Sequence, residues 1–278
     1  MLKVRVIPVL LTQDGLLKKP VQFKNSRTVA NVITIVRVFE ARQVDELMLL
    51  DIGSTVEEEE YDPFLIKQVS EEVFMPFAYG GGIKSVEQMT QIIRAGAEKI
   101  VINTAAVANP KLITEGSKKF GSQCIIVSID AKRKKDGSYE VYTRSGSKPT
   151  GLDPVKWAKK VEKLGAGEIL LNSITHEGTM DGYDIELMRM VSDAVKIPII
   201  AAGGAGKLED FVKVVKEGHA SAAAAGSIFH YTPITPDMAK KAMHDAGIPV
   251  RPPKIFETAS LYKGKKFVIH KPKEKEVQ

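Results

Sequence analysis

Residues 79–85 read Tyr79-Gly80-Gly81-Gly82-Ile83-Lys84-Ser85, and residues 201–206 read Ala201-Ala202-Gly203-Gly204-Ala205-Gly206. Each glycine loop follows a short apolar run and precedes a helical pattern. Glycine lets the backbone approach an anion closely, and free N–H groups at a helix start can stabilise the charge of that anion. A tight structural turn would explain a single loop of this kind. Two such loops at equivalent points of the chain favour two phosphate-binding sites.

An internal repeat relates the two glycine loops, because an offset of 122 residues separates Gly81 from Gly203. The same offset aligns further anchors: Asp14-Gly15 with Asp136-Gly137, residues 44–50 with 166–172, Tyr61-Asp62 with Tyr183-Asp184, Pro76 with Pro198, and Gly96 with Gly218. A unit of this length is too long for a solenoid repeat. Each copy is therefore expected to form half of one domain.

Eight short apolar runs predict strands that are covered on both faces, at residues 4–10, 47–51, 75–79, 99–103, 124–130, 168–172, 197–202 and 220–225. Helical patterns separate the runs: Ser85 and Gln88 predict a capping box, and Asp153 precedes Pro154 as an N-cap. This alternation predicts an α/β fold, either a closed parallel barrel or a doubly wound sheet. The two-fold repeat of four βα units favours the barrel, a (β/α)8 TIM barrel made of two repeated half-barrels. We expect the barrel over residues 1–247, with half-barrels at about 1–122 and 123–247, and a basic C-terminal extension over 248–278.

Charge and composition exclude several classes of protein. The net charge is +6, but residues 251–278 hold 8 Lys or Arg against 3 Asp or Glu, so the rest of the chain carries only +1. A fold that binds nucleic acid would carry the excess on its core. No apolar stretch approaches the roughly 20 residues that span a bilayer, and no signal-peptide pattern is present. We therefore expect a soluble, cytoplasmic protein that binds neither nucleic acid nor membrane. The only cysteine, Cys124, is expected to be a buried structural thiol.

The active site of a barrel lies at the C-terminal ends of its strands. Hydroxyl or backbone donors follow the strands that neighbour the glycine loops, at Asn103-Thr104 and at Gly226-Ser227. A ligand phosphorylated at both ends could therefore span the barrel mouth. The predicted phosphate ligands are Gly81, Gly82, Asn103, Thr104, Gly178, Gly203, Gly204, Gly226 and Ser227.

Motifs in order and with nearly unchanged spacing make residues 1–247 resemble the cyclase (HisF) family of imidazole glycerol phosphate synthase. They include Ile7-Pro8, Lys19, Leu50-Asp51-Ile52, Ile102-Asn103-Thr104-Ala105-Ala106, Ser128-Ile129-Asp130-Ala131-Lys132-Arg133 and Gly165-Ala166-Gly167-Glu168-Ile169, besides both glycine loops. The resemblance implies that ammonia from a glutaminase (HisH-like) subunit crosses the barrel and attacks a bis-phosphorylated ribonucleotide. Neither a cofactor nor a metal site is predicted.

Four charged residues of alternating sign lie near the N-terminal ends of the first, second, fourth and sixth strands: Arg5, Glu46, Lys99 and Glu168. The resemblance implies that they form a salt-bridged gate to the ammonia channel, with the glutaminase at the N-terminal face of the barrel. The alternative is a charge-paired plug that only closes the barrel floor. Buried ionic groups tend to survive only with partners or a function.

The sequence departs from the family pattern at the catalytic positions. Leu11 stands where the family has an aspartate that acts as a general acid and base, while the second catalytic aspartate is kept as Asp130. The family's threonine after the sixth strand becomes Asn172, and its two aspartates become Thr175 and Glu177. We therefore expect cyclase activity to be severely impaired. The candidate catalytic residues are Asp130, Asp14, Lys19 and Glu177.

The roles of Asp14 and His176 are open, and Trp157 is expected to have a structural role. Asp14 is a surrogate for the missing carboxylate, although a shift of three positions would misplace it by several ångströms. His176 is either a base at the site or a solvated loop histidine. Trp157, within a helical pattern, is expected to pack in the core.

This combination of residues resembles divergent family members that are encoded with surface-polysaccharide genes. The resemblance implies a barrel subunit of a glutamine amidotransferase complex that passes ammonia to a phosphorylated or nucleotide-sugar acceptor for an acetamidino sugar, with a sugar amidotransferase as a further partner. The alternatives are a genuine histidine-pathway cyclase and a non-catalytic scaffold that activates a glutaminase. The C-terminal extension is either an arm that clips to a partner subunit or symmetry mate, or an inert appendage.

Overall fold

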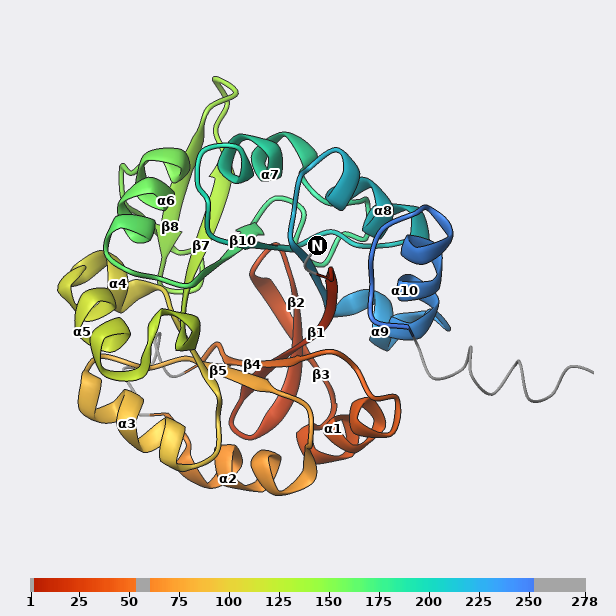
Figure 1. The fold of residues 1–278 in the computed structure, drawn as a ribbon, viewed down its shortest axis with the longest axis horizontal. Coiled ribbons are helices and arrows are strands. Elements are labelled where there is room, and N and C mark those ends of the chain that lie inside the picture. Colours follow the sequence, from red (N-terminus) through yellow and green to blue (C-terminus); the bar gives the residue numbers. More distant parts are fainter. Residues whose placement is uncertain (1–2, 54–60, 253–278) are drawn as a thin grey trace, which may run out of the picture.

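The computed structural model describes residues 3–53 and 61–252 of the 278-residue chain. Eight parallel strands close into a barrel in the order β1-β4-β5-β6-β7-β10-β11-β12, with β12 pairing back to β1. Figure 1 looks along this barrel, with the helices as an outer ring. The strands are β1 (Arg5–Gln13), β4 (Leu47–Asp51), β5 (Phe77–Gly80), β6 (Lys99–Ile102), β7 (Ile125–Arg133), β10 (Glu168–Ser173), β11 (Ile199–Ala202) and β12 (Ala222–Ala225). The predicted TIM barrel is confirmed.

The helices cover the outside of the barrel, in the alternation that the apolar runs predict. They are α1 (Val32–Ala41), α2 (Pro63–Glu72), α3 (Val86–Arg94), α4 (Thr104–Ala108), α5 (Lys111–Phe120), α6 (Pro154–Lys163), α7 (Ile185–Ser192), α8 (Leu208–Lys216), α9 (Ser227–Tyr231) and α10 (Pro236–Asp245). The Asp153 side chain accepts from the N–H of Lys156 at the start of α6, as predicted. The Ser85 cap of α3 also forms, but the Gln88 side chain accepts from Lys84 N rather than from Ser85 N.

Two hairpins extend the barrel beyond the predicted strands. The strand β1 continues into an antiparallel pair with β2 (Leu16–Val21), which pairs with β3 (Lys24–Asn31). The strand β7 likewise pairs with β8 (Tyr139–Thr143), and β8 with β9 (Lys148–Pro149). Each hairpin follows the first strand of a predicted half-barrel along the chain. The division into half-barrels stays a prediction.

Strand alternation gives the barrel two separate apolar cores. Side chains on the outer face of the strands pack against the helices. This outer core includes Trp157 of α6, which is 3% exposed. Side chains on the inner face fill the barrel: Ile7, Val9, Leu11, Met48, Ala78, Val101, Ile126, Leu170, Ile200, Ala202, Ala222 and Ala224. Arg5 lies on the same face of β1 as Ile7, Val9 and Leu11. The inner face of β1 therefore runs from the barrel floor to the barrel mouth.

The prediction that Cys124 lies in a buried strand is wrong. Ser122–Cys124 form a turn of 3₁₀ helix, Cys124 is half-buried, and β7 begins at Ile125. The first residues of the predicted C-terminal extension contact the barrel, because Val4 N donates to Pro249 O (2.7 Å) and Val4 pairs with Val250. The remainder of that extension, residues 253–278, lies outside the described residues. Within residues 3–53 and 61–252, no helix has the length and hydropathy needed to cross a membrane.

Candidate functional site

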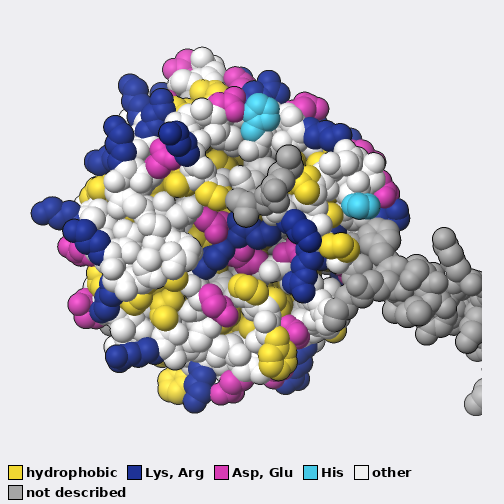
Figure 2. Space-filling view, in the orientation of Figure 1, with side chains coloured by type: hydrophobic (Ala, Val, Ile, Leu, Met, Phe, Trp, Pro, Cys, Tyr) yellow, Lys and Arg dark blue, Asp and Glu magenta, His cyan; other side chains and the backbone are white. Residues whose placement is uncertain are grey.

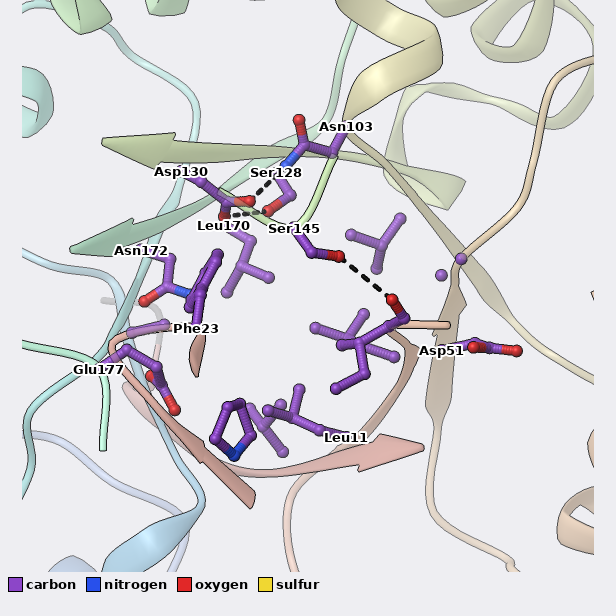
Figure 3. A pocket seen from close by; sticks show the side chains of 18 of the residues that line it. Leu11, Phe23, Asp51, Asn103, Ser128, Asp130, Ser145, Leu170, Asn172 and Glu177 are labelled. Carbon is purple, nitrogen blue, oxygen red and sulfur yellow. Dashed lines mark hydrogen bonds between the residues drawn. The ribbon is translucent and has the colours of Figure 1, made fainter. Parts of the chain in front are cut away.

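A pocket of about 590 Å³ opens at the C-terminal ends of the barrel strands. This volume suits a small-molecule ligand. Strand ends from all sides of the barrel line it, and the β2–β3 hairpin contributes Phe23. Figure 3 shows Asp130, Asn103 and Ser128 on one side of the pocket and Leu11 on the opposite side. Asp130 therefore faces Leu11 across the pocket.

Asp130 is the central group among these polar side chains. It lies in β7, is 6% exposed, and accepts hydrogen bonds from Asn103 Nδ2 (2.6 Å) and Ser128 Oγ (3.3 Å). Burial raises the pKa of Asp130 to about 7, although these two hydrogen bonds oppose the shift. Such a carboxyl group can both accept and donate a proton near neutral pH.

Lys19 and Glu177 enter the same pocket from β2 and from the loop after β10. Lys19 is 3% exposed, and burial lowers the pKa of its ammonium group while the charge of Glu177 opposes the shift. Burial raises the pKa of Glu177, and Lys19 opposes that shift in turn. The Lys19 ammonium group occupies the space that a Cβ at position 226 would need. Gly226 is therefore required by the placement of Lys19.

The structure separates Leu11 from Asp14. Leu11 lines the pocket and is 8% exposed, whereas Asp14 is exposed at the turn between β1 and β2, with a φ of 53°, and does not line the pocket. Because of this position, Asp14 cannot replace the family's aspartate without a rearrangement of the hairpin. Besides Leu11, the pocket is lined by six acidic and basic side chains: Lys19, Lys24, Asp51, Lys84, Asp130 and Glu177.

All nine predicted phosphate ligands line the pocket. They fall into two groups on opposite sides of the barrel, after the paired strands β5 and β6 and after the paired strands β11 and β12, with Gly178 in the loop after β10. Two side chains of the first group already have partners: Asn103 donates to Asp130, and Thr104 Oγ1 accepts from Arg144 N (3.0 Å).

Phosphate binding gives the first testable prediction. We expect two inorganic phosphate ions in a crystal structure obtained from phosphate buffer, one at Gly81-Gly82 and one at Gly203-Gly204. All four glycines have positive φ angles, between 65° and 124°, which other residues rarely adopt. Because glycine has no side chain, the N–H groups of these loops can approach an anion closely. The same crystals transferred to chloride should lose both ions. Side chains that block both loops in the phosphate structure would contradict the prediction.

The four predicted gate residues form a closed ring at the other end of the barrel. Arg5 Nη1 lies 2.5 Å from Glu46 Oε2, and Arg5 Nη2 lies 2.5 Å from Glu168 Oε2. Lys99 Nζ closes the ring at 2.9 Å from Glu46 Oε1 and 2.7 Å from Glu168 Oε1. Figure 2 shows side chains of both charges gathered around the centre of this face. The ring occupies the barrel floor, below the inner apolar core.

The pKa values in the ring reflect its pairing. Burial alone would raise the pKa of Glu168, but hydrogen bonds and charge from Arg5 and Lys99 lower it overall. Burial alone would lower the pKa of Arg5, but Glu168 and Glu46 raise it overall. Pairing within the ring therefore favours the ionised forms of both Arg5 and Glu168.

Several residues of the site were not predicted. Ser128 lies two positions before Asp130, so strand alternation could have placed it on the same face. Ser145 and Phe23 line the pocket only because the two hairpins fold over its mouth, where Gln22 N donates to Glu177 O (2.8 Å). His176 does not line the pocket; its Nδ1 contacts Ser173 Oγ (3.0 Å) and lies 3.6 Å from Asp184 Oδ2.

A metal site was not predicted, and no group of three or more His, Cys, Asp or Glu side chains in the described part of the chain could hold a metal ion.

Comparison with known proteins agrees with this geometry. Residues 5–235 match the model of the family described as histidine biosynthesis protein. The imidazole glycerol phosphate synthase subunit HisF of Caulobacter vibrioides is 48% identical over 252 residues, which cover 90% of this chain and 97% of the relative. The same subunit of Alkaliphilus metalliredigens is 43% identical over 251 residues, covering 90% of this chain and all of the relative. The barrel, the pocket and these relatives identify the chain as a member of the HisF family.

Proposed function

We propose that this chain is the barrel subunit of a glutamine amidotransferase complex. A glutaminase subunit docks at the N-terminal face and releases ammonia at the charged ring of Arg5, Glu46, Lys99 and Glu168. The ammonia crosses the barrel to the pocket, where a phosphorylated or nucleotide-sugar acceptor of surface-polysaccharide synthesis receives it as part of an acetamidino sugar. A sugar amidotransferase is a further proposed partner, and the cytoplasm is the proposed location.

The observation that carries this proposal is the connection of ring and pocket along one apolar interior. Between the ring and the pocket the inner core contains small side chains, including Ala78, Ala222 and Ala224. An uncharged ammonia molecule can cross such an interior, whereas an ammonium ion would lose its hydration without gaining a partner. The ring supports the same view, because it lies at the floor of this interior and the movement of one side chain would open a path into it.

The pocket supplies the groups that ammonia transfer needs. Attack of the ammonia lone pair on an electrophilic carbonyl-type carbon forms a C–N bond, shifts the π electron pair of the C=O bond onto its oxygen atom, and leaves a surplus proton on nitrogen. The Asp130 carboxylate, whose pKa of about 7 suits this exchange, takes that proton. Lys19 and the backbone donors of the two glycine loops bind the anionic groups of the acceptor. Leu11 has no proton to exchange, so the β1 side of the pocket only contacts the acceptor.

A genuine cyclase of histidine biosynthesis is the second candidate. The relatives named HisF favour it, since they match nearly the whole barrel at 43% to 48% identity. The position of Leu11 in the pocket wall argues against it. The third candidate, a non-catalytic scaffold, would activate its glutaminase without any acceptor chemistry.

Lys99→Ala tests the proposed path of ammonia. In a complex with its glutaminase subunit, the wild-type protein should transfer ammonia from glutamine without releasing it to the solvent. Lys99→Ala opens the ring between Glu46 and Glu168, so ammonia should escape and the ratio of glutamine hydrolysed to product formed should rise several-fold. The measurement compares glutamate, free ammonia and product.

Exposed Lys118→Ala on α5 is the matched control and should leave the ratio unchanged. An unchanged ratio in Lys99→Ala would remove the gate assignment. Glutaminase activation by the wild-type chain with no aminated product from any phosphorylated sugar or nucleotide sugar would favour the scaffold instead.

A further inference from the structure

A buried cluster of ions lies beside the barrel floor and takes no part in the ring or the pocket. Lys240, on α10, is only 1% exposed. Its Nζ lies 3.5 Å from Asp45 Oδ1 and 3.4 Å from Asp237 Oδ1. Removing three charges from water is unfavourable unless the geometry compensates for it, so such a cluster is weak evidence for stability alone. The cluster is therefore expected to hold neighbouring segments of the backbone in place.

Asp45 connects the two backbone segments that carry half of the charged ring. It directly precedes Glu46, and its Oδ2 accepts a hydrogen bond from Val6 N (3.2 Å), the residue after Arg5. The ladder between β1 and β4 begins only at Val9 and Met48. The hydrogen bond from Val6 N to the Asp45 side chain therefore joins the segments that precede this ladder, at the level of the charged ring.

The end of α10 holds the same segment of β1 from its other side. Ile248 N donates to Met243 O (2.9 Å), and the chain then pairs with Val4, whose N–H donates to Pro249 O. The helix α10 also packs against β1 (Figure 1). Arg5 thus lies between two contacts that lead to α10, one through Val4 and one through Val6, Asp45 and Lys240.

We propose that Lys240 and Asp45 are positioning residues of the charged ring. Their ion pair fixes the spacing of the backbone at Arg5 and Glu46, and so keeps the ring closed. Without the lysine, two buried carboxylates would face each other with no cation between them, and Asp45 would turn toward water and release Val6 N–H. That the ring acts as an ammonia gate rests on the proposed function. The spacing of the backbone at Arg5 and Glu46 does not, because it can be measured in this chain without a partner.

The first test measures the ring directly in the full-length chain. Nuclear magnetic resonance can follow the exchange with water of the Arg5 Nη–H groups, which donate to Glu46 and Glu168. Lys240→Met should accelerate this exchange by about tenfold or more, while the buried amide of Val127 in β7 reports any global loss of stability. Lys241→Met is the matched control, because Lys241 neighbours Lys240 but is exposed and pairs with Asp245.

Two further variants test the same ion pair. If Lys240→Met does not fold, Asp45→Asn is used instead, because it removes the charge that pairs with Lys240 and keeps an oxygen acceptor for Val6 N–H. Asp45→Asn should also accelerate Arg5 exchange relative to the wild-type protein. Lys240→Arg keeps the cation and should restore slow exchange. Arg5 exchange that stays at the wild-type rate in a folded Lys240→Met or Asp45→Asn protein would overturn the proposal.

The second test uses the complex with the glutaminase. Lys240→Met should lower the ratio of glutamine-dependent to ammonium-dependent product formation several-fold, because ammonium added to the solvent reaches the pocket without passing the ring. If the wild-type complex shows no glutamine-dependent transfer, the proposed function fails and the exchange measurement alone decides this inference. If wild type and Lys240→Met transfer equally well and exchange equally slowly, only the inference fails.

Discussion

Asp130→Asn is expected to lower the rate of acceptor amination by about 10²- to 10⁴-fold, the range that a placed proton-transfer group contributes. The amide keeps the shape of the side chain. Its oxygen can still accept from Asn103 and its NH2 group can donate to Ser128 Oγ, but it cannot take a proton. The rate of the wild-type protein should rise with pH through about 7, because the carboxylate form is the base. The measurement is the ammonium-dependent rate between pH 5 and pH 9, which bypasses the glutaminase.

The same substitution should stabilise the protein at high pH. Because burial raises the pKa of Asp130 from 3.8 to about 7, the folded state binds its proton more tightly than the unfolded state. The resulting loss of stability is fully present above pH 7 and disappears as the pH falls below 4. Asp130→Asn should therefore raise the free energy of unfolding by about 1 to 4 kcal/mol at pH 8 and have little effect at pH 3.5.

Opposite effects on rate and stability would identify Asp130 as a residue kept for chemistry rather than for the fold. Denaturant unfolding at the two pH values supplies the stability measurement, and it needs no knowledge of the acceptor. Ser128→Ala is the matched control, since it removes one hydrogen bond to Asp130 and leaves the carboxyl group in place. A variant that loses stability at pH 8 would contradict the assignment of a buried, destabilising acid.

The barrel could be predicted because eight continuous apolar runs alternate with helical patterns, and because the chain repeats as two halves of four such units. The strand ends were less predictable: β1 and β7 continue for several residues because hairpin partners supply hydrogen bonds there. Those partners, β2 and β8, carry charged and hydroxyl residues that give no apolar run. The hairpin strand β2 nevertheless brings Lys19 into the pocket.

The site was predicted as a set of residues but not as a set of interactions. Asp130 and the nine phosphate ligands lie at strand ends, where the barrel rule places active sites. Asp14 lies outside the pocket because β1 runs three residues further before its turn. The partnership of Asn103 with Asp130, and the raised pKa that burial produces, depend on distances across the barrel. Spacing along the chain contains no information about such distances.

With saturating ammonium and the ribonucleotide of the histidine pathway, the wild-type protein should show little or no cyclisation, at least about 10²-fold below an ordinary cyclase. Leu11 lies in the pocket wall opposite Asp130, and its side chain cannot move a proton (Figure 3). One missing carboxylate corresponds to about 3 to 5 kcal/mol of transition-state stabilisation. The ribonucleotide should still bind, because both glycine loops line the pocket.

Leu11→Asp is the informative variant, and Leu11→Asn is its control of nearly equal shape. A gain of cyclisation in Leu11→Asp alone would mean that the rest of a cyclase site is assembled, with Asp130 as the partner group. The gain should follow the ionisation of the new carboxyl group, because Leu11→Asn places an amide in the same wall without a proton to exchange. Cyclisation by the wild-type protein at ordinary rates would overturn the polysaccharide proposal, since Asp130 with Glu177 would then suffice for the chemistry.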